Sequence, residues 1–69
     1  MKTITKHKAY IYCTQFHLDM LKGNEAYADN YSLGEALERI EKLEDNIVKE
    51  DIIGWGNPYL DMLVEEIFG

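Results

Sequence analysis

The sequence predicts an all-α protein folded as a compact three-helix bundle. Three segments repeat apolar residues at helical spacing, approximately 8–22, 33–46 and 58–68. Of the 69 residues, 46% are hydrophobic, which is enough to form one core. Three amphipathic helices with short connections bury their apolar faces most simply against one another. We therefore expect a single domain over 1–69, with a basic N-terminal arm at 1–7.

The first segment, residues 8–22, is the ambiguous one, because its tyrosine, isoleucine, threonine and phenylalanine favour β-sheets. At about 100° per residue, however, its polar side chains fall in one narrow sector. The apolar side chains that cover the rest are Ala9, Tyr10, Ile11, Cys13, Phe16, Leu18, Met20 and Leu21. Lys22 and Gly23 then match a cationic last turn and a glycine stop. The period favours a helix, and the alternative is a small α+β fold with an N-terminal strand or hairpin at 3–16 packed on two helices.

The second segment has a clear start signal at Ser32. Ser32 and Glu35 fit a capping box, in which the serine hydroxyl accepts a backbone N–H and the glutamate reaches back to the cap. An apolar face and a charged face follow. We expect this helix to end near Asn46 or a few residues beyond.

The connection to the third segment contains the only tryptophan, Trp55, between Gly54 and Gly56. This arrangement predicts a turn that folds the indole ring back onto the core. Asn57 and Pro58 come next, and asparagine at the cap with proline at the first helical position is a strong helix start. The third helix is expected to continue to the C-terminus.

The charges are distributed unevenly along the chain. Residues 1–18 contain Lys2, Lys6 and Lys8 and no acid, whereas the remainder contains 13 acids and 4 basic residues and so carries −9. A body of that charge repels phosphate, which disfavours direct nucleic-acid binding. A helix-turn-helix reader also needs basic and amide side chains on its recognition helix. The third segment has no basic residue.

One cysteine, Cys13, excludes an intrachain disulfide, and small secreted domains usually depend on disulfides. No segment approaches the roughly 18 uninterrupted apolar residues of a membrane span. The N-terminus lacks the apolar core and cleavage site of a signal peptide. These features predict a cytoplasmic protein that does not act on a membrane.

Cys13 and His17 lie one helical turn apart, with His7 further upstream, but a structural zinc site needs four ligands. We interpret the pair as a buried cysteine beside a half-buried histidine. A thiolate pair within a helix also lacks an oxyanion site, and the carboxylates lie on polar faces where solvent keeps their pKa ordinary. We therefore expect no metal, no cofactor and no enzymatic activity.

The acidic surface and the tyrosines are the remaining features that predict a function. Acids three or four residues apart on a helix are about 5–6 Å apart, comparable to successive phosphates of a nucleic-acid strand. Tyrosine is also enriched at interface hot spots. The residues predicted to contact a partner are Glu38, Glu41, Asp45, Asp61, Glu65, Tyr27 and Tyr31. The same acids would also serve as a solvated face that keeps a small protein soluble.

Size and charge make the chain similar to the small acidic inhibitors that phages and mobile elements direct against host nucleases. The leading hypothesis is therefore a stoichiometric inhibitor or regulator that binds another protein with a basic surface and mimics nucleic acid. The alternative is a self-associating helical module, such as a homodimer, or an accessory subunit of a larger complex. Its interface would be apolar and would include Ile11, Leu18 and Met62, near the polar borders of their helices.

Overall fold

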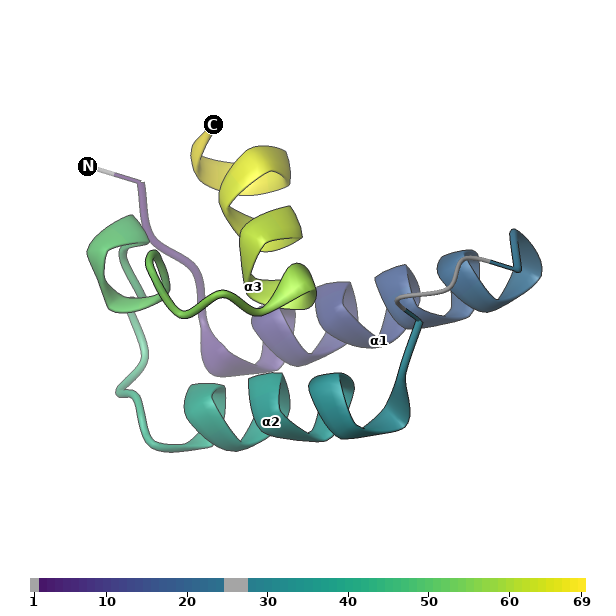
Figure 1. The fold of residues 1–69 in the computed structure, drawn as a ribbon. Coiled ribbons are helices and arrows are strands. Elements are labelled where there is room, and N and C mark those ends of the chain that lie inside the picture. Colours follow the sequence, from purple (N-terminus) through teal and green to yellow (C-terminus); the bar gives the residue numbers. More distant parts are fainter. Residues whose placement is uncertain (1, 25–27) are drawn as a thin grey trace.

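The computed structural model describes residues 2–24 and 28–69. Its three helices pack against one another (Figure 1). The elements are α1 (Lys6–Lys22), α2 (Asn30–Glu41), the 3-10 turn η1 (Lys49–Asp51), α3 (Pro58–Leu63) and the π-helical segment η2 (Val64–Phe68). α1 and α2 run antiparallel, and α3 crosses them steeply. The described residues form no strand, so the all-α bundle is confirmed and the α+β alternative at 3–16 is wrong.

α1 begins at Lys6, two residues before the predicted start, because two side chains complete its first turn. The Thr5 hydroxyl accepts the Lys8 N–H at 3.2 Å. The Lys6 N–H donates to Asp45 Oδ1 at 3.0 Å, from the loop that follows α2. A carboxylate at a helix N-terminus is also favoured by the helix dipole. The predicted arm at 1–7 is therefore shorter by the two residues that enter α1.

α2 begins at Asn30, three residues before the predicted start at residue 33, so the predicted capping box of Ser32 and Glu35 is wrong. Asp29 is the cap, and its carboxylate accepts the Tyr31 N–H at 3.0 Å and the Ser32 hydroxyl at 2.9 Å. Aspartate and serine cap helices about equally well. The earlier start is favoured because it adds a turn of helix and lets Ser32 support the cap.

α2 ends at Glu41 rather than near Asn46, because the chain must turn to reach the N-terminal arm. Ile47 and Ile4 form an isolated antiparallel bridge, with N–H···O distances of 2.8 and 3.1 Å. Both side chains are buried. Asn46 has a φ of 71°, a left-handed conformation that reverses the chain just before the bridge. A longer α2 would move Asp45 away from the Lys6 N–H and would break the bridge between Ile47 and Ile4.

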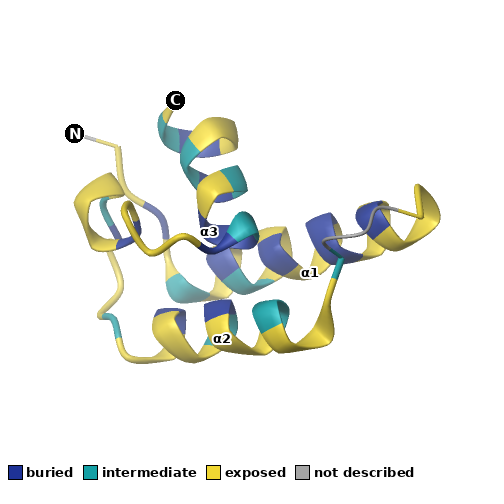
Figure 2. Cartoon of the chain, viewed as in Figure 1, coloured by how far each residue is buried: buried dark blue, intermediate teal, exposed yellow. Residues whose placement is uncertain are grey.

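The core lies where the three helices face one another (Figure 2). Its buried hydrophobic residues are Ile4, Ala9, Cys13, Phe16, Met20, Ala36, Ile40, Ile47, Ile52, Tyr59, Leu60, Leu63 and Ile67. The buried residues of α1 recur at helical spacing, as the periodicity predicts. The cap of α3 also agrees with the prediction, since Asn57 Oδ1 accepts the Tyr59 N–H at 2.9 Å and Pro58 follows it.

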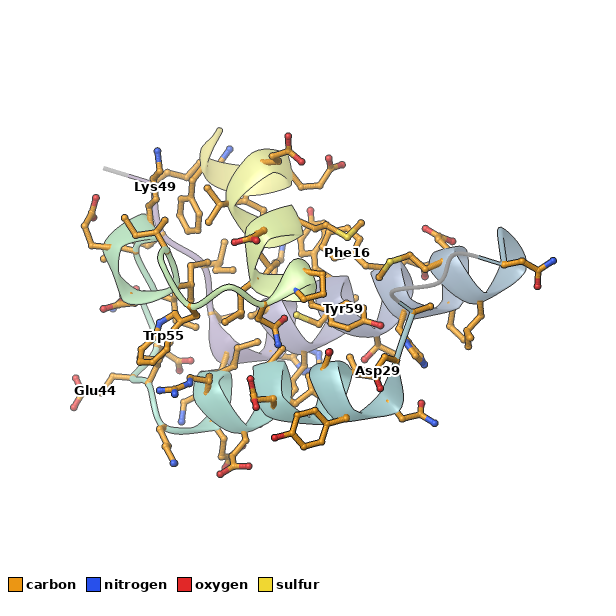
Figure 3. All side chains as sticks on the ribbon, in the orientation of Figure 1. Phe16, Asp29, Glu44, Lys49, Trp55 and Tyr59 are labelled. Carbon is orange, nitrogen blue, oxygen red and sulfur yellow. The ribbon has the colours of Figure 1, made fainter. Side chains whose placement is uncertain are left out.

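The hydroxyl group of Tyr59 connects the three helices. The Tyr59 side chain is fully buried, and its hydroxyl lies 2.6 Å from His17 Nδ1 in α1. The same oxygen accepts the N–H of Asp29, the cap of α2, at 3.2 Å (Figure 3). Donation from Tyr59 to His17 Nδ1 then satisfies all three groups. His17 is only 7% exposed, and is therefore more deeply buried than the sequence predicts.

Replacing Tyr59 with phenylalanine is expected to lower the free energy of unfolding by about 1–3 kcal/mol, because the buried His17 Nδ1 and Asp29 N–H lose their partner. Urea unfolding measures the change. Tyr31→Phe is the matched control, since the Tyr31 side chain is 75% exposed. It should change stability by no more than about 0.5 kcal/mol. Equal effects of the two substitutions would show that the hydroxyl network contributes nothing.

The pKa of Asp29 lies below its usual value of 3.8, because the Ser32 hydroxyl and the Tyr31 N–H donate to the carboxylate. A lowered carboxyl pKa contributes stability that is present above the unfolded value and is lost as pH falls through the folded value. Asp29→Asn preserves a good cap but does not titrate. Unfolding measured from neutral to acidic pH should therefore show a smaller acid loss of stability in Asp29→Asn than in the wild type. Parallel curves would contradict this assignment.

Candidate protein-binding surface

The acidic side chains are almost entirely at the surface. The described residues include 12 of the 13 acids, all but Glu25, and each of the 12 is exposed. Among these residues one ion pair forms, between Lys42 Nζ and Glu38 Oε1 at 3.6 Å, with both side chains 71% exposed. Exposed pairs of this kind contribute about 0–1 kcal/mol. Most of the negative charge is therefore not neutralised within the described part of the molecule.

The three acids predicted to form a row on α2 have different surroundings. Glu41 accepts a hydrogen bond from the Tyr10 hydroxyl, and this bond raises the pKa of Tyr10. Asp45 lies beyond the end of α2 and accepts the first amide of α1. Glu38 faces Lys42 on the outer side of α2. Two of the three predicted contact residues therefore hold the bundle together, and Glu38 is the one on the outer surface of α2.

Asp61 and Glu65, the other predicted acids, are exposed on α3 and η2. α3 meets α2 at its start, where Asn57 Nδ2 donates to the Ser32 carbonyl oxygen at 2.9 Å, and then leads away from it (Figure 1). The structure therefore does not join these acids to those of α2 in one row. Of the two predicted tyrosines, Tyr31 is exposed at the start of α2, and Tyr27 lies outside the described residues.

The outer side of α2 has two adjoining hollows. One, of about 330 Å³, is lined by Tyr31, Glu35, Glu38, Arg39 and Lys42. The other, of about 290 Å³, is lined by Asn30, Tyr31, Gly34, Glu35 and Glu38. Tyr31, Glu35 and Glu38 border both hollows, so they form a ridge between them. The sequence pattern assigns Glu35 to a capping box and places Tyr31 before the helix. Because α2 begins at Asn30, Tyr31 and Glu35 are both helical, and their four-residue spacing places them on one face.

Trp55 lies beside this surface and not in the core, so the predicted packing of its ring is wrong (Figure 3). Gly54 and Gly56 have φ values of 81° and 69°, left-handed conformations that glycine adopts without strain. The indole N–H donates to the Asp51 carbonyl oxygen at 3.2 Å. The Arg39 guanidinium carbon lies 3.3 Å from the ring centroid, a cation–π contact, and Trp55 remains 47% exposed.

The outward side of α1 has a second, apolar stripe. Ile11, Leu18 and Leu21 are each about half exposed, because their positions lie away from the buried face of the helix. Met62, predicted to accompany them, is only partly exposed and packs against the core. Lys8 also lies on the exposed side of α1. Contiguous exposed apolar patches are typical of interaction surfaces, and Ile11, Leu18 and Leu21 are the most exposed large apolar side chains of α1.

Cys13 is fully buried, and desolvation raises the pKa of its thiol to about 12. It is therefore a core residue, as its place in the apolar arc of α1 predicts, and not an activated nucleophile. Within residues 2–24 and 28–69, no three histidine, cysteine or acidic side chains group in a way that could hold a metal ion.

None of the described helices is long and apolar enough to cross a membrane. Comparisons with protein-family models, with curated proteins and with solved structures gave no match to this chain. The candidate surfaces are therefore characterised by their own geometry: the ridge on α2 with Trp55 beside it, and the apolar stripe on α1.

Gly34 borders one of the hollows from inside α2, and a Cβ at this position would meet no atom within 4 Å. Gly34→Ala is therefore expected to raise the free energy of unfolding by about 0.5–1 kcal/mol, because alanine loses less backbone entropy in a helix. Urea unfolding tests this. Gly54→Ala is the contrasting control, since its positive φ should make the same change destabilising by about 1–2 kcal/mol. A destabilised Gly34→Ala would contradict the open environment of this position.

Proposed function

We propose that the protein acts by binding the basic surface of another protein, as a stoichiometric inhibitor or regulator of a nucleic-acid-binding protein such as a nuclease. The observation that carries this proposal is the exposed and largely unpaired acidic surface, with one ion pair for 12 described acids. A partner that supplies the missing positive charge gains from every carboxylate it approaches. Long-range attraction between the two fields would also speed association.

The proposed class of partner follows from the spacing of the carboxylates. Neighbouring acids on one helical face, such as Glu35 and Glu38, are about 5–6 Å apart. A groove that binds a nucleic-acid backbone presents cations at similar intervals, because it must meet successive phosphates. A protein that presents acids at this spacing can occupy such a groove and exclude the nucleic acid. This mode of inhibition requires no pocket, metal or nucleophile in the inhibitor.

The second candidate is a self-associating module or an accessory subunit, favoured by the exposed stripe of Ile11, Leu18 and Leu21. Burying these side chains in an interface would remove apolar surface from water, at about 25 cal/mol per Å². The two candidates differ in their response to salt. Binding through carboxylates weakens as salt rises, whereas an apolar interface holds or tightens.

The first test is affinity capture from a nuclease-treated lysate of the source cell, with washes at low and then high salt. The expected result is a nucleic-acid-binding protein that is released by salt. In a second step, the purified partner should lose nucleic-acid binding when one equivalent of this protein is added. A control with denatured bait removes partners that respond to charge alone.

Two outcomes would contradict the proposal. The first is a salt-resistant partner that does not bind nucleic acid, and the second is recovery of this chain alone. Either result would favour the apolar interface on α1. Sedimentation of the wild type and of Leu18→Glu would then show whether that interface joins two copies.

A further inference from the structure

We infer that the outer face of α2 is the docking site for a cationic segment of the partner, with one arginine or lysine side chain inserted beside Tyr31, Glu35 and Glu38. This inference rests on the proposed function and assigns it to one surface. In the described part of the chain these residues are exposed, and the two hollows on this face share the same three side chains.

The three side chains provide complementary contacts for a guanidinium or ammonium group. Glu35 and Glu38 are one helical turn apart, so their carboxylates can receive hydrogen bonds from one cation. The Tyr31 ring, 75% exposed, offers a π face within the same lining. An arginine side chain can stack on the ring and donate to a carboxylate at once, because its guanidinium is planar.

Within the described residues, the molecule's own cations form no ion pair with Glu35. Arg39 also lines the hollow, but its guanidinium lies on the Trp55 ring. Lys42 is the one that competes, through its pair with Glu38 at 3.6 Å. Since that pair is exposed and weak, a partner cation can displace Lys42. Removing Lys42 should therefore strengthen binding, an effect that a purely structural role of this face would not produce.

Trp55 and Arg39 extend the outer face of α2 with an aromatic ring that is held in place. Two contacts restrain the Trp55 ring, the cation–π contact with Arg39 and the hydrogen bond to the Asp51 carbonyl oxygen. Ile53, nearby in the loop, is about half exposed. Tryptophan, tyrosine and arginine are the residues most enriched at interface hot spots. A side chain that is already restrained loses little conformational entropy on binding.

The experiment uses the full chain and a synthetic peptide of alternating arginine and glycine as the probe. Trp55 is the only tryptophan, so its fluorescence reports binding beside α2, and amide chemical shifts locate the contact. The variants are Glu35→Gln with Glu38→Gln, Tyr31→Ala, and Lys42→Ala. The matched control is Asp61→Asn with Glu65→Gln, which removes the same charge from α3 and η2. All of these residues are exposed, so each variant should fold, and circular dichroism verifies this.

The α2 double variant should bind the peptide about tenfold more weakly, and Tyr31→Ala about threefold more weakly. The control should change affinity by no more than about twofold, because its charges act only at a distance. Lys42→Ala should bind about twofold more tightly. Shifts should concentrate on α2 and the Trp55 indole.

Equal losses of peptide affinity in the two double variants would overturn this inference. They would leave the proposed function intact, because the negative charge of the whole molecule would then attract the peptide. Absence of peptide binding by the wild type, or shifts centred on another element, would also overturn it. Failure of the proposed function has a separate signature, the absence of any salt-released nucleic-acid-binding partner in the capture experiment.

Discussion

The arrangement of the bundle depends on the two hydrogen bonds of the Tyr59 hydroxyl group. It lies in the core at the start of α3, 2.6 Å from His17 of α1, and it accepts the amide of Asp29 before α2. Asp29 in turn holds the first turn of α2 through its carboxylate. A buried oxygen with one partner on α1 and one at the cap of α2 therefore fixes where α2 begins. The outward position of Tyr31, two residues later, follows from that start.

The carboxylates of this protein have two different roles: some accept hydrogen bonds within the fold, and others face solvent. Asp29 and Asp45 accept backbone amides at the starts of α2 and α1, and Glu41 joins α2 to α1 through Tyr10. These bonds stabilise the fold, although all three side chains are solvent-exposed. Among the described residues, carboxylates such as Glu35 make no such bond and remain open to an external cation. Net charge alone does not separate the two kinds, because both are acids on a helix or in a polar loop.

Local patterns in the sequence predicted much of the fold. The apolar period of α1 identified a helix despite its β-favouring residues, and Asn57 with Pro58 located the start of α3. These signals are short-range, so they need no knowledge of the partner helices. The boundaries of α2 were misplaced because they depend on distant groups: Tyr59 fixes its cap, and the Ile47 pairing with Ile4 sets its end. Trp55 was misplaced for the same reason, since the cation that covers its ring is Arg39 of α2, which is distant in the sequence.

The candidate site was only partly predictable. The exposure of Tyr31 and the acidic character of α2 were visible in the sequence, and Glu38 was among the predicted contacts. Glu35 was assigned a capping role because Ser32 resembled a cap, so the ridge could not be recognised. Whether an acid faces solvent or accepts a distant amide is a tertiary property. The internal role of Asp45 therefore had no signal in the sequence.

The bond between Asp45 and the first amide of α1 has a consequence for the folding pathway. It spans 39 residues of sequence, so the N-terminal turn of α1 is completed only after α2 has docked and the chain has turned back. Helical bundles usually fold fast because their contacts are local. Here the centre of α1 can form early, whereas its first turn must wait for loop closure. Substitutions at that turn should then act mainly on the rate of unfolding and give low φ-values.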